Sequence, residues 1–161
     1  MVLIELFAGI LVGTEIATDL LWPLEATYFS ETDADALLVI RTNFPLAQDL
    51  GNVYDITDDA LHAIADKHPH ALLAVLGGPP CVDVSRLSAG RVGVTGARSS
   101  LVSEFQRVWE TLVLAAPNRC VALLENTLMD PKDQATYDNV FPLATHSPTP
   151  NLPPPIPLTY P

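Results

Sequence analysis

Residues 2–13 read VLIELFAGILVG, a short apolar run that passes into a turn containing glycine. An apolar run of this length predicts a buried strand at Val2–Leu6, closed by the turn at Ala8-Gly9. The next stretch predicts a helix at Gly13–Leu21, which ends before a proline. A strand, a glycine turn and a helix in this order open a parallel α/β unit.

The same alternation continues along the chain. Thr32 is expected to cap a helix that runs to about Arg41, and Thr57 to cap a second helix with acidic residues in its first turn. Further strands are predicted at Ala26–Ser30, Val53–Tyr54 (a weak signal), Ala71–Leu76 and Val121–Leu124. A later amphipathic helix is indicated by Leu101, Phe105, Val108 and Leu112. This rhythm predicts an α/β fold with a doubly wound, mainly parallel sheet.

The length of 161 residues suits one domain, and 48% hydrophobic residues are enough to fill its core. We expect a folded domain over residues 1–146 and a proline-rich extended tail over residues 147–161. No apolar run reaches the roughly 18 residues of a membrane span, and no basic region of a signal peptide leads the sequence. With only two cysteines in the chain, these features predict an intracellular protein, nuclear if the organism is eukaryotic.

The charge is strongly acidic but unevenly distributed. The net charge of −11 is opposite to that of a typical free-standing nucleic-acid binder. However, no Asp or Glu occurs from Val84 to Ser103, and half of the 8 basic residues gather in or near this segment. They are Arg86, Arg91, Arg98 and Arg107.

Ligands of doubly wound sheets bind beyond the carboxyl ends of the strands, so the residues directly after each predicted strand form the candidate site. These residues are Phe7-Ala8-Gly9, Glu31, Asp55, Gly78-Pro79-Pro80-Cys81 and Glu125-Asn126. Three carboxylates, one thiol and two glycine turns are therefore expected to meet at one edge of the sheet.

Each of these residues has a plain structural interpretation beside the functional one. The glycine turn can bind a cofactor closely or merely reverse the chain. Glu31 follows the glycine turn at close to the spacing of about 20 residues at which an acid accepts hydrogen bonds from ribose hydroxyls in nucleoside-binding folds. It can equally be a solvated acid at the start of a helix. Asp55 can bind an adenine amino group or simply precede a helix.

The cysteines and histidines can also be interpreted as either functional or structural residues. Cys81 is either a nucleophile or a small buried hydrophobic residue, and the stiff GGPPC context favours the first. Cys120, at the start of a core strand, is expected to be structural. His62, His68 and His70 lack further ligands nearby, so no metal site is predicted.

Taken together, the motifs resemble those of the cytosine-5 DNA methyltransferases across residues 2–127. ELFAGILVG is similar to the first motif of that family, SETDADA to the second, YDIT to the third, GGPPCVDVS to the catalytic-cysteine motif and LLENT to the Glu-Asn motif. Within the family, residues 83–105 resemble the animal de novo enzymes. The fold implied is the Rossmann-like fold of S-adenosylmethionine-dependent methyltransferases, of which the chain resembles the front half and is expected to be truncated.

The resemblance implies a specific chemistry. Cys81 would add as a thiolate to carbon 6 of a flipped-out cytosine in DNA, carbon 5 would take a methyl group from S-adenosylmethionine, and loss of the carbon-5 proton would release the thiol. Glu125 would hold the ring nitrogen and amino group. Cofactor contacts are implied for Phe7, Ala8, Gly9, Ile10, Glu31, Asp55, Ile56 and Leu101. The loop with Arg86, Arg91 and Arg98 would lie on DNA phosphate.

The sequence also departs from the family pattern. Val82 stands where Gln or Asn is usual, Thr127 replaces Val, and Val102-Ser103 replace an aromatic pair used for dimerisation. The Arg-containing motif and target-recognition region are not found. Two functions therefore stay open: a methyltransferase domain whose second half comes from another chain, or a non-catalytic regulator or remnant that pairs with a complete methyltransferase. An unrelated α/β thiol enzyme is a third and weaker interpretation.

Overall fold

A computed structural model of the chain describes residues 1–79 and 100–125. In these two ranges a strand alternates with a helix almost throughout. The strands are β1 (Val2–Leu6), β2 (Ala26–Ser30), β3 (Gln48–Asp49), β4 (Leu73–Gly77) and β5 (Cys120–Leu124). The helices are α1 (Val12–Asp19), α2 (Ala34–Asn43), α3 (Asp58–Lys67) and α4 (Ser100–Ala115), with a 3₁₀ turn, η1, at Val53–Asp55.

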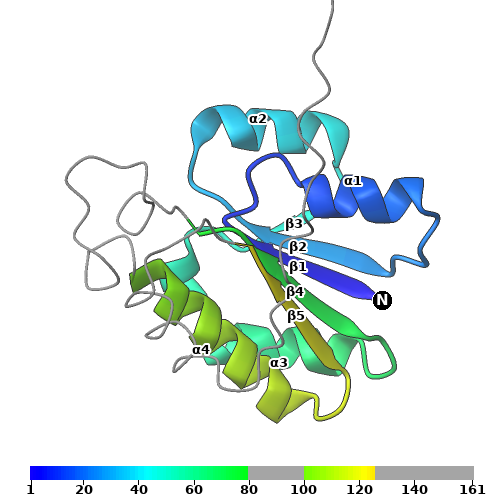
Figure 1. Cartoon of the computed structure of the whole chain (residues 1–161), viewed down its shortest axis with the longest axis vertical. Coiled ribbons are helices and arrows are strands. Elements are labelled where there is room, and N and C mark those ends of the chain that lie inside the picture. Colours follow the sequence, from blue (N-terminus) through cyan, green and yellow to red (C-terminus); the bar gives the residue numbers. More distant parts are fainter. Residues whose placement is uncertain (80–99, 126–161) are drawn as a thin grey trace, which may run out of the picture.

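The strands of the described ranges form one sheet in the order β3-β2-β1-β4-β5, and every pair in it is parallel. Helices α1 and α2 cover one face, and α3 and α4 cover the other (Figure 1). The chain reverses its direction of winding between β1 and β4, which is the place where such folds bind ligands. The predicted doubly wound α/β fold is confirmed.

The core explains why the central strands are continuous apolar runs. Alternate residues of β1, such as Ile4, pack with β4, α3 and α4 in the larger cluster. On the opposite face Leu3 packs with Ala17 of α1 and Ala74 of β4. A second small cluster on Leu11, Phe29 and Ile40 holds α2. Strands covered on both faces need apolar side chains at successive positions.

The N-terminal caps of α2 and α3 can be compared with the caps predicted from the sequence. Thr57 caps α3 as predicted, because its hydroxyl accepts a hydrogen bond from the Ala60 N–H at 3.2 Å. The predicted cap at Thr32 is wrong by one residue. Asp33 caps α2 instead, and its carboxylate accepts from the N–H groups of Asp35 and Ala36.

The strand predicted at Val53–Tyr54 is also wrong. This segment is the 3₁₀ turn η1, whose preceding Asn52 accepts a hydrogen bond from the Tyr54 N–H through its side chain. Val53 is buried in the core, which accounts for the apolar signal. The true third strand, Gln48–Asp49, is a short and exposed edge strand, so no apolar pattern marks it. Strand β4 also lies slightly later than predicted, at Leu73–Gly77.

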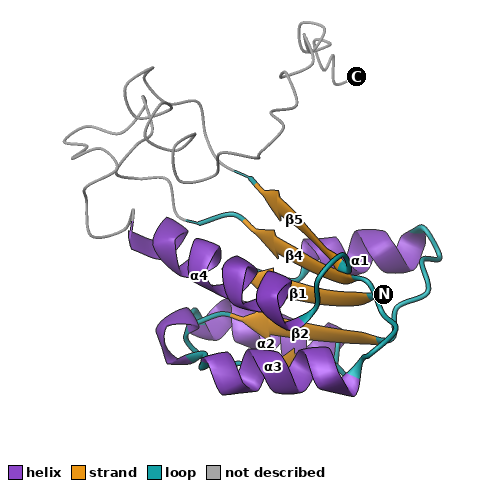
Figure 2. Ribbon diagram, turned by 90° about the horizontal axis from the view of Figure 1, so that it is seen from below, coloured by secondary structure: helices purple, strands orange, loops and turns teal. Residues whose placement is uncertain are grey.

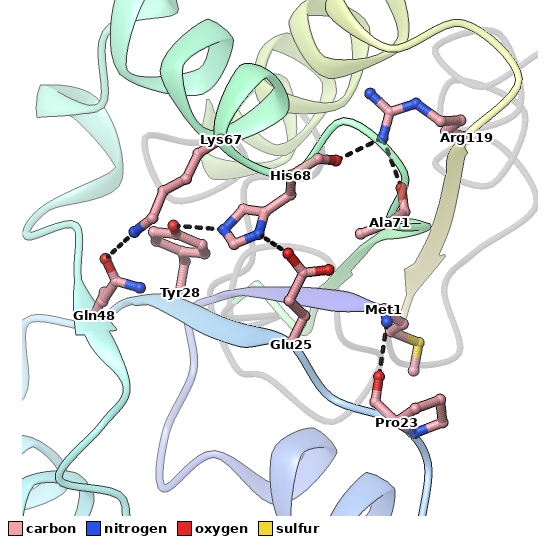
Figure 3. Close-up of polar contacts among 9 residues, drawn as sticks. All are labelled: Met1, Pro23, Glu25, Tyr28, Gln48, Lys67, His68, Ala71 and Arg119. Carbon is pink, nitrogen blue, oxygen red and sulfur yellow. Dashed lines mark hydrogen bonds and ion pairs between the residues drawn. The ribbon is translucent and has the colours of Figure 1, made fainter.

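A polar cluster ties the amino ends of the strands together (Figure 3). The buried ring of His68 lies between Glu25 and Tyr28, with Nδ1 2.6 Å from Glu25 Oε1 and Nε2 3.0 Å from the Tyr28 hydroxyl. Arg119 donates through one guanidinium nitrogen to the carbonyls of His68 and Ala71. This cluster stabilises the end of the sheet opposite the candidate site. Cys120, at the same end, donates its thiol to main-chain carbonyls of α4 and its neighbour Ala116, as expected of a structural cysteine.

Candidate functional site

Four strands end level with one another at the carboxyl edge of the sheet. Leu6 of β1 lies in register with Ser30 of β2 and with Gly77 of β4, and Gly77 lies in register with Leu124 of β5. The next residue of each strand therefore emerges on one line. These residues are Glu31, Phe7, Gly78 and Glu125. Figure 2 shows the ends of β4 and β5 side by side at this edge.

The loop between β1 and α1 has an unusual backbone. Phe7, Gly9 and Leu11 have positive φ angles of 55°, 54° and 64°. Only glycine adopts this conformation without cost, and strained backbone of this kind clusters at functional sites. Within residues 1–79 and 100–125, no atom outside the residues next to Gly9 lies within 4 Å of the place where a Cβ on Gly9 would stand, so these residues leave space above this peptide.

Glu31 fixes this loop to the end of β2. One carboxylate oxygen accepts a hydrogen bond from the Gly9 N–H at 2.8 Å. The other accepts from the N–H groups of Thr32 and Asp33 at 2.6 and 2.9 Å. A carboxylate has about four acceptor sites, so Glu31 can still receive a hydroxyl from a ligand. The glycine turn and this acid, which were both expected at the carboxyl edge of the sheet, are thus in direct contact.

Glu5 supports the same loop from within the core, and the sequence analysis missed it. Its buried carboxylate accepts from the N–H of Gly13 at 3.1 Å and from the N–H and hydroxyl of Thr14 at 2.7 and 2.5 Å. Burial raises the pKa of Glu5, and these hydrogen bonds oppose that shift. The available signal was an acid inside an apolar strand, because a buried carboxylate must find donors.

Gly77 and Gly78 allow close contacts at the carboxyl ends of β4 and β5. A Cβ on Gly77 would stand 2.8 Å from the ring of Phe105, so this position lets α4 pack closely on the sheet. A Cβ on Gly78 would stand 3.1 Å from Glu125 Oε2, so the Glu125 carboxylate lies over the Gly78 main chain. The main chains are also joined, because the Glu125 N–H donates to the Gly77 carbonyl at 2.9 Å.

Of the other predicted cofactor residues, some pack on the core and the rest are exposed. Phe7 and Leu101 are partly buried and pack on the large core cluster, of which the buried Ile56 is a member. Ala8 packs instead on the cluster around Leu11. Ile10 and Asp55 are exposed, with Asp55 at the end of η1 rather than directly after a strand.

Arg107 takes no part in a free basic surface. Its guanidinium contacts Glu104 at 2.9 Å, Asp58 at 3.2 Å and the Val53 carbonyl at 3.2 Å, and it joins α4 to α3 and η1. The predicted nucleophile and DNA contacts lie outside the described residues. They are Cys81, Arg86, Arg91 and Arg98, and the predicted tail over 147–161 lies outside them as well.

The described ranges hold neither a metal-binding cluster nor a membrane-spanning helix. Residues 1–79 and 100–125 contain no group of three or more His, Cys, Asp or Glu side chains placed to hold a metal ion. In the same ranges no helix has the length and apolar character needed to cross a membrane.

The fold is that of an α/β domain with a doubly wound parallel sheet, and its switch point lies between β1 and β4. The particular family follows from the sequence as a whole, because the family model for C-5 cytosine-specific DNA methylases matches residues 1–136. The chain therefore belongs to the C-5 cytosine-specific DNA methylase family. The match establishes the family but does not support a particular subfamily. The closer resemblance to the animal de novo enzymes therefore stays a prediction.

Solved structures agree at the level of the fold. The chain is similar to a crystal structure described as that of a DNA modification methyltransferase encoded within an E. coli prophage. The two are 20% identical with a TM-score of 0.56, and the match covers 88% of this chain and 37% of that one. The chain thus spans little more than a third of that structure's length. No curated protein matches the sequence.

Proposed function

We propose that this chain is the cofactor-binding part of a DNA (cytosine-5) methyltransferase that uses S-adenosylmethionine. The observation that carries the proposal is the family match over residues 1–136 together with a carboxyl edge on which Glu31 and Glu125 stand in one row, with Gly9 bonded to Glu31. When bound, S-adenosylmethionine supplies the methyl group.

Several residues of the chain would contact the cofactor. Glu31, held by Gly9, would accept the ribose hydroxyls, and the open peptide at Gly9 would let the ligand approach the main chain. Phe7, Ile56 and Leu101 would contact the flat base, with Asp55 near its amino group. This assignment is supported by the contact of the acid Glu31 with the glycine turn at the carboxyl edge.

The nucleophilic step belongs to Cys81. Its thiolate would form a bond to carbon 6 of cytosine, carbon 5 would then take the methyl group, and loss of the carbon-5 proton would break the carbon–sulfur bond and release the thiolate. Glu125 would hydrogen-bond to the ring nitrogen and the amino group, which stabilises the charge that develops on the ring. The loop with Arg86, Arg91 and Arg98 would contact DNA phosphates.

The test measures cofactor binding and methyl transfer separately. We expect the chain to bind S-adenosylmethionine in a calorimetric titration and to transfer tritiated methyl to cytosine-containing DNA, with Cys81→Ser abolishing transfer but not binding. Asp66→Ala, an exposed acid on α3, serves as the control. If neither binding nor transfer occurs in a folded chain, the proposal is wrong.

A second function is favoured by the charge distribution. With a net charge of −11 and with Arg107 paired to Asp58 and Glu104, the described surface offers little to attract DNA. The chain would then be a regulator that keeps the cofactor site and pairs with a complete methyltransferase. Cofactor binding without methyl transfer, whether or not DNA is present, would select this function over catalysis.

A further inference from the structure

Ser30 is a buried polar residue at the carboxyl end of β2, and no role described above uses its side chain. It is 2% exposed, and it lies on the same face of the sheet as Tyr28, because side chains alternate along a strand. Tyr28 belongs to the large core cluster, so this face of β2 packs on apolar residues. A hydroxyl buried there costs free energy unless it is hydrogen-bonded. Packing alone therefore does not account for a serine at this position.

The hydroxyl of Ser30 is bonded to the loop that follows β3. It donates to the Gly51 carbonyl at 2.8 Å. Gly51 has a φ angle of +74°, and its N–H donates to Asp49 Oδ1 at 2.8 Å, so both main-chain polar groups of this glycine are bonded. At Gly51 the chain passes from the edge strand β3 to the 3₁₀ turn η1. Ser30 thus fixes the point at which this loop leaves the sheet.

The turn at Gly51 is joined directly to Asp55 and Ile56. Asn52 follows Gly51 and caps η1, because its side chain accepts a hydrogen bond from the Tyr54 N–H at 3.1 Å. The Asn52 carbonyl accepts from the Asp55 N–H at 2.8 Å. Ile56 is buried in the core, whereas the Asp55 side chain is exposed. A shift of the Gly51 main chain would therefore move Asp55.

The main chain of Ser30 holds the loop on the other side of β2. Its carbonyl accepts a hydrogen bond from the Ala8 N–H at 3.1 Å, in the loop after β1. The next residue, Glu31, accepts from the Gly9 N–H of the same loop at 2.8 Å. Strand β2 lies between β1 and β3 in the sheet (Figure 1). Ser30 is thus bonded to the loops on both sides of its own strand, through its hydroxyl on one side and its carbonyl on the other.

We propose that Ser30 is a positioning residue of the cofactor site, which holds the loop of Asp55 at a fixed distance from the glycine turn. The inference rests on the proposed function, in which Glu31 accepts the ribose hydroxyls and Asp55 binds the adenine amino group. The ribose and the base of one nucleoside can meet both acids only when the two loops are correctly spaced. Ser30 therefore contributes to the preference for adenine over other bases, because that preference depends on the placement of Asp55.

The test compares two ligands that differ at the edge of the base. S-Adenosylhomocysteine has an amino group there, which donates to a carboxylate, whereas S-inosylhomocysteine has a carbonyl oxygen in its place, which a carboxylate repels. We expect the wild-type chain to bind the first ligand more tightly in calorimetric titrations. Ser30→Ala removes the hydrogen bond to Gly51 and should reduce this preference by about five-fold or more.

Tyr28→Phe is the matched control. It also removes one buried hydroxyl from the same face of β2, but this hydroxyl is bonded to His68 Nε2 at 3.0 Å, away from the loops of the candidate site. It should lower stability and leave the preference between the two ligands unchanged. Gly51→Ala is a second variant, because alanine is strained at a φ angle of +74° and the residue is exposed. It should displace the same carbonyl and reduce the preference as Ser30→Ala does.

Three results would overturn the role of Ser30. The wild type could bind both ligands equally, the preference could be unchanged in Ser30→Ala and Gly51→Ala, or Tyr28→Phe could reduce it to the same extent. Thermal unfolding shows which variants are folded, and Gly51→Ala decides the question if Ser30→Ala is not. A folded wild-type chain that binds neither ligand would instead contradict the proposed function, on which this inference rests.

Discussion

The Glu31 carboxylate accepts a hydrogen bond from the Gly9 main-chain N–H at 2.8 Å, across the gap between β2 and the loop after β1. The residue expected to receive the ligand's hydroxyls is therefore also the residue that holds the glycine turn in place. One substitution should disturb both the contact and the loop.

Glu31→Ala is expected to weaken S-adenosylmethionine binding by about 1 to 3 kcal/mol, or roughly 5- to 150-fold. It removes an acceptor from the N–H groups of Gly9, Thr32 and Asp33. Calorimetric titration measures the loss, and Asp66→Ala, a substitution of an exposed acid on α3, should leave the affinity unchanged. Equal affinities for Glu31→Ala and the control would remove Glu31 from the binding site.

Glu5 predicts a pH dependence of stability. Because burial raises its pKa above the ordinary value of 4.5, the folded chain holds this proton more tightly than the unfolded chain does. The contribution of Glu5 to stability is therefore full below 4.5 and is lost as pH rises through the folded pKa. Relative to Glu5→Gln, the wild type should lose stability over that interval in urea unfolding. A difference that grows with pH would contradict this.

Glu25 predicts the opposite slope. The hydrogen bond from His68 lowers the pKa of Glu25 below 4.5, with further contributions from the charges of His68, the amino terminus and His70. Its contribution to stability is full above 4.5 and is lost as pH falls through the folded pKa. The advantage of the wild type over Glu25→Gln should therefore disappear in acid. An advantage that persists at the lowest pH of the folded range would contradict this prediction.

The adjacent glycines of β4 and its following loop should respond differently to alanine. In Gly77→Ala the new methyl group would collide with the Phe105 ring, and we expect a loss of about 1 to 3 kcal/mol in the free energy of unfolding. In Gly78→Ala the only neighbour among the described residues is the exposed Glu125 side chain, so stability should change by less than about 0.5 kcal/mol. Displacement of that carboxylate should instead reduce methyl transfer. Chemical denaturation and the methylation assay separate the two effects.

The predictions from sequence succeeded where the physical signal is local and strong. Strands β1 and β2 were predicted at their observed bounds, because buried parallel strands are apolar at successive positions. The edge strand Gln48–Asp49 was missed because both residues are exposed and carry no such pattern. Thr32 and Asp33 are both good caps, and only the main-chain geometry selects Asp33.

The candidate site was also predictable in part, where a residue's position follows from the fold. Glu31 and Glu125 could be assigned to the edge because each directly follows a strand, and the fold rule then brings them to one side. The contacts of Glu5 with Gly13 and Thr14 could not be predicted, because they depend on where α1 begins in space. The ion pair of Arg107 with Asp58 was equally unpredictable, since Asp58 lies on a different helix.

The level ends of the strands place a strict condition on their lengths. Ser30, Leu6, Gly77 and Leu124 form one row, so the residues that follow them keep their order only while every strand keeps its count of residues. Loss of one residue from β2 would withdraw Glu31 by about 3.3 Å and turn its side chain to the other face of the sheet. Insertions and deletions should therefore be rare within these strands and common in the turns at their amino ends, on the side of the sheet opposite the candidate site.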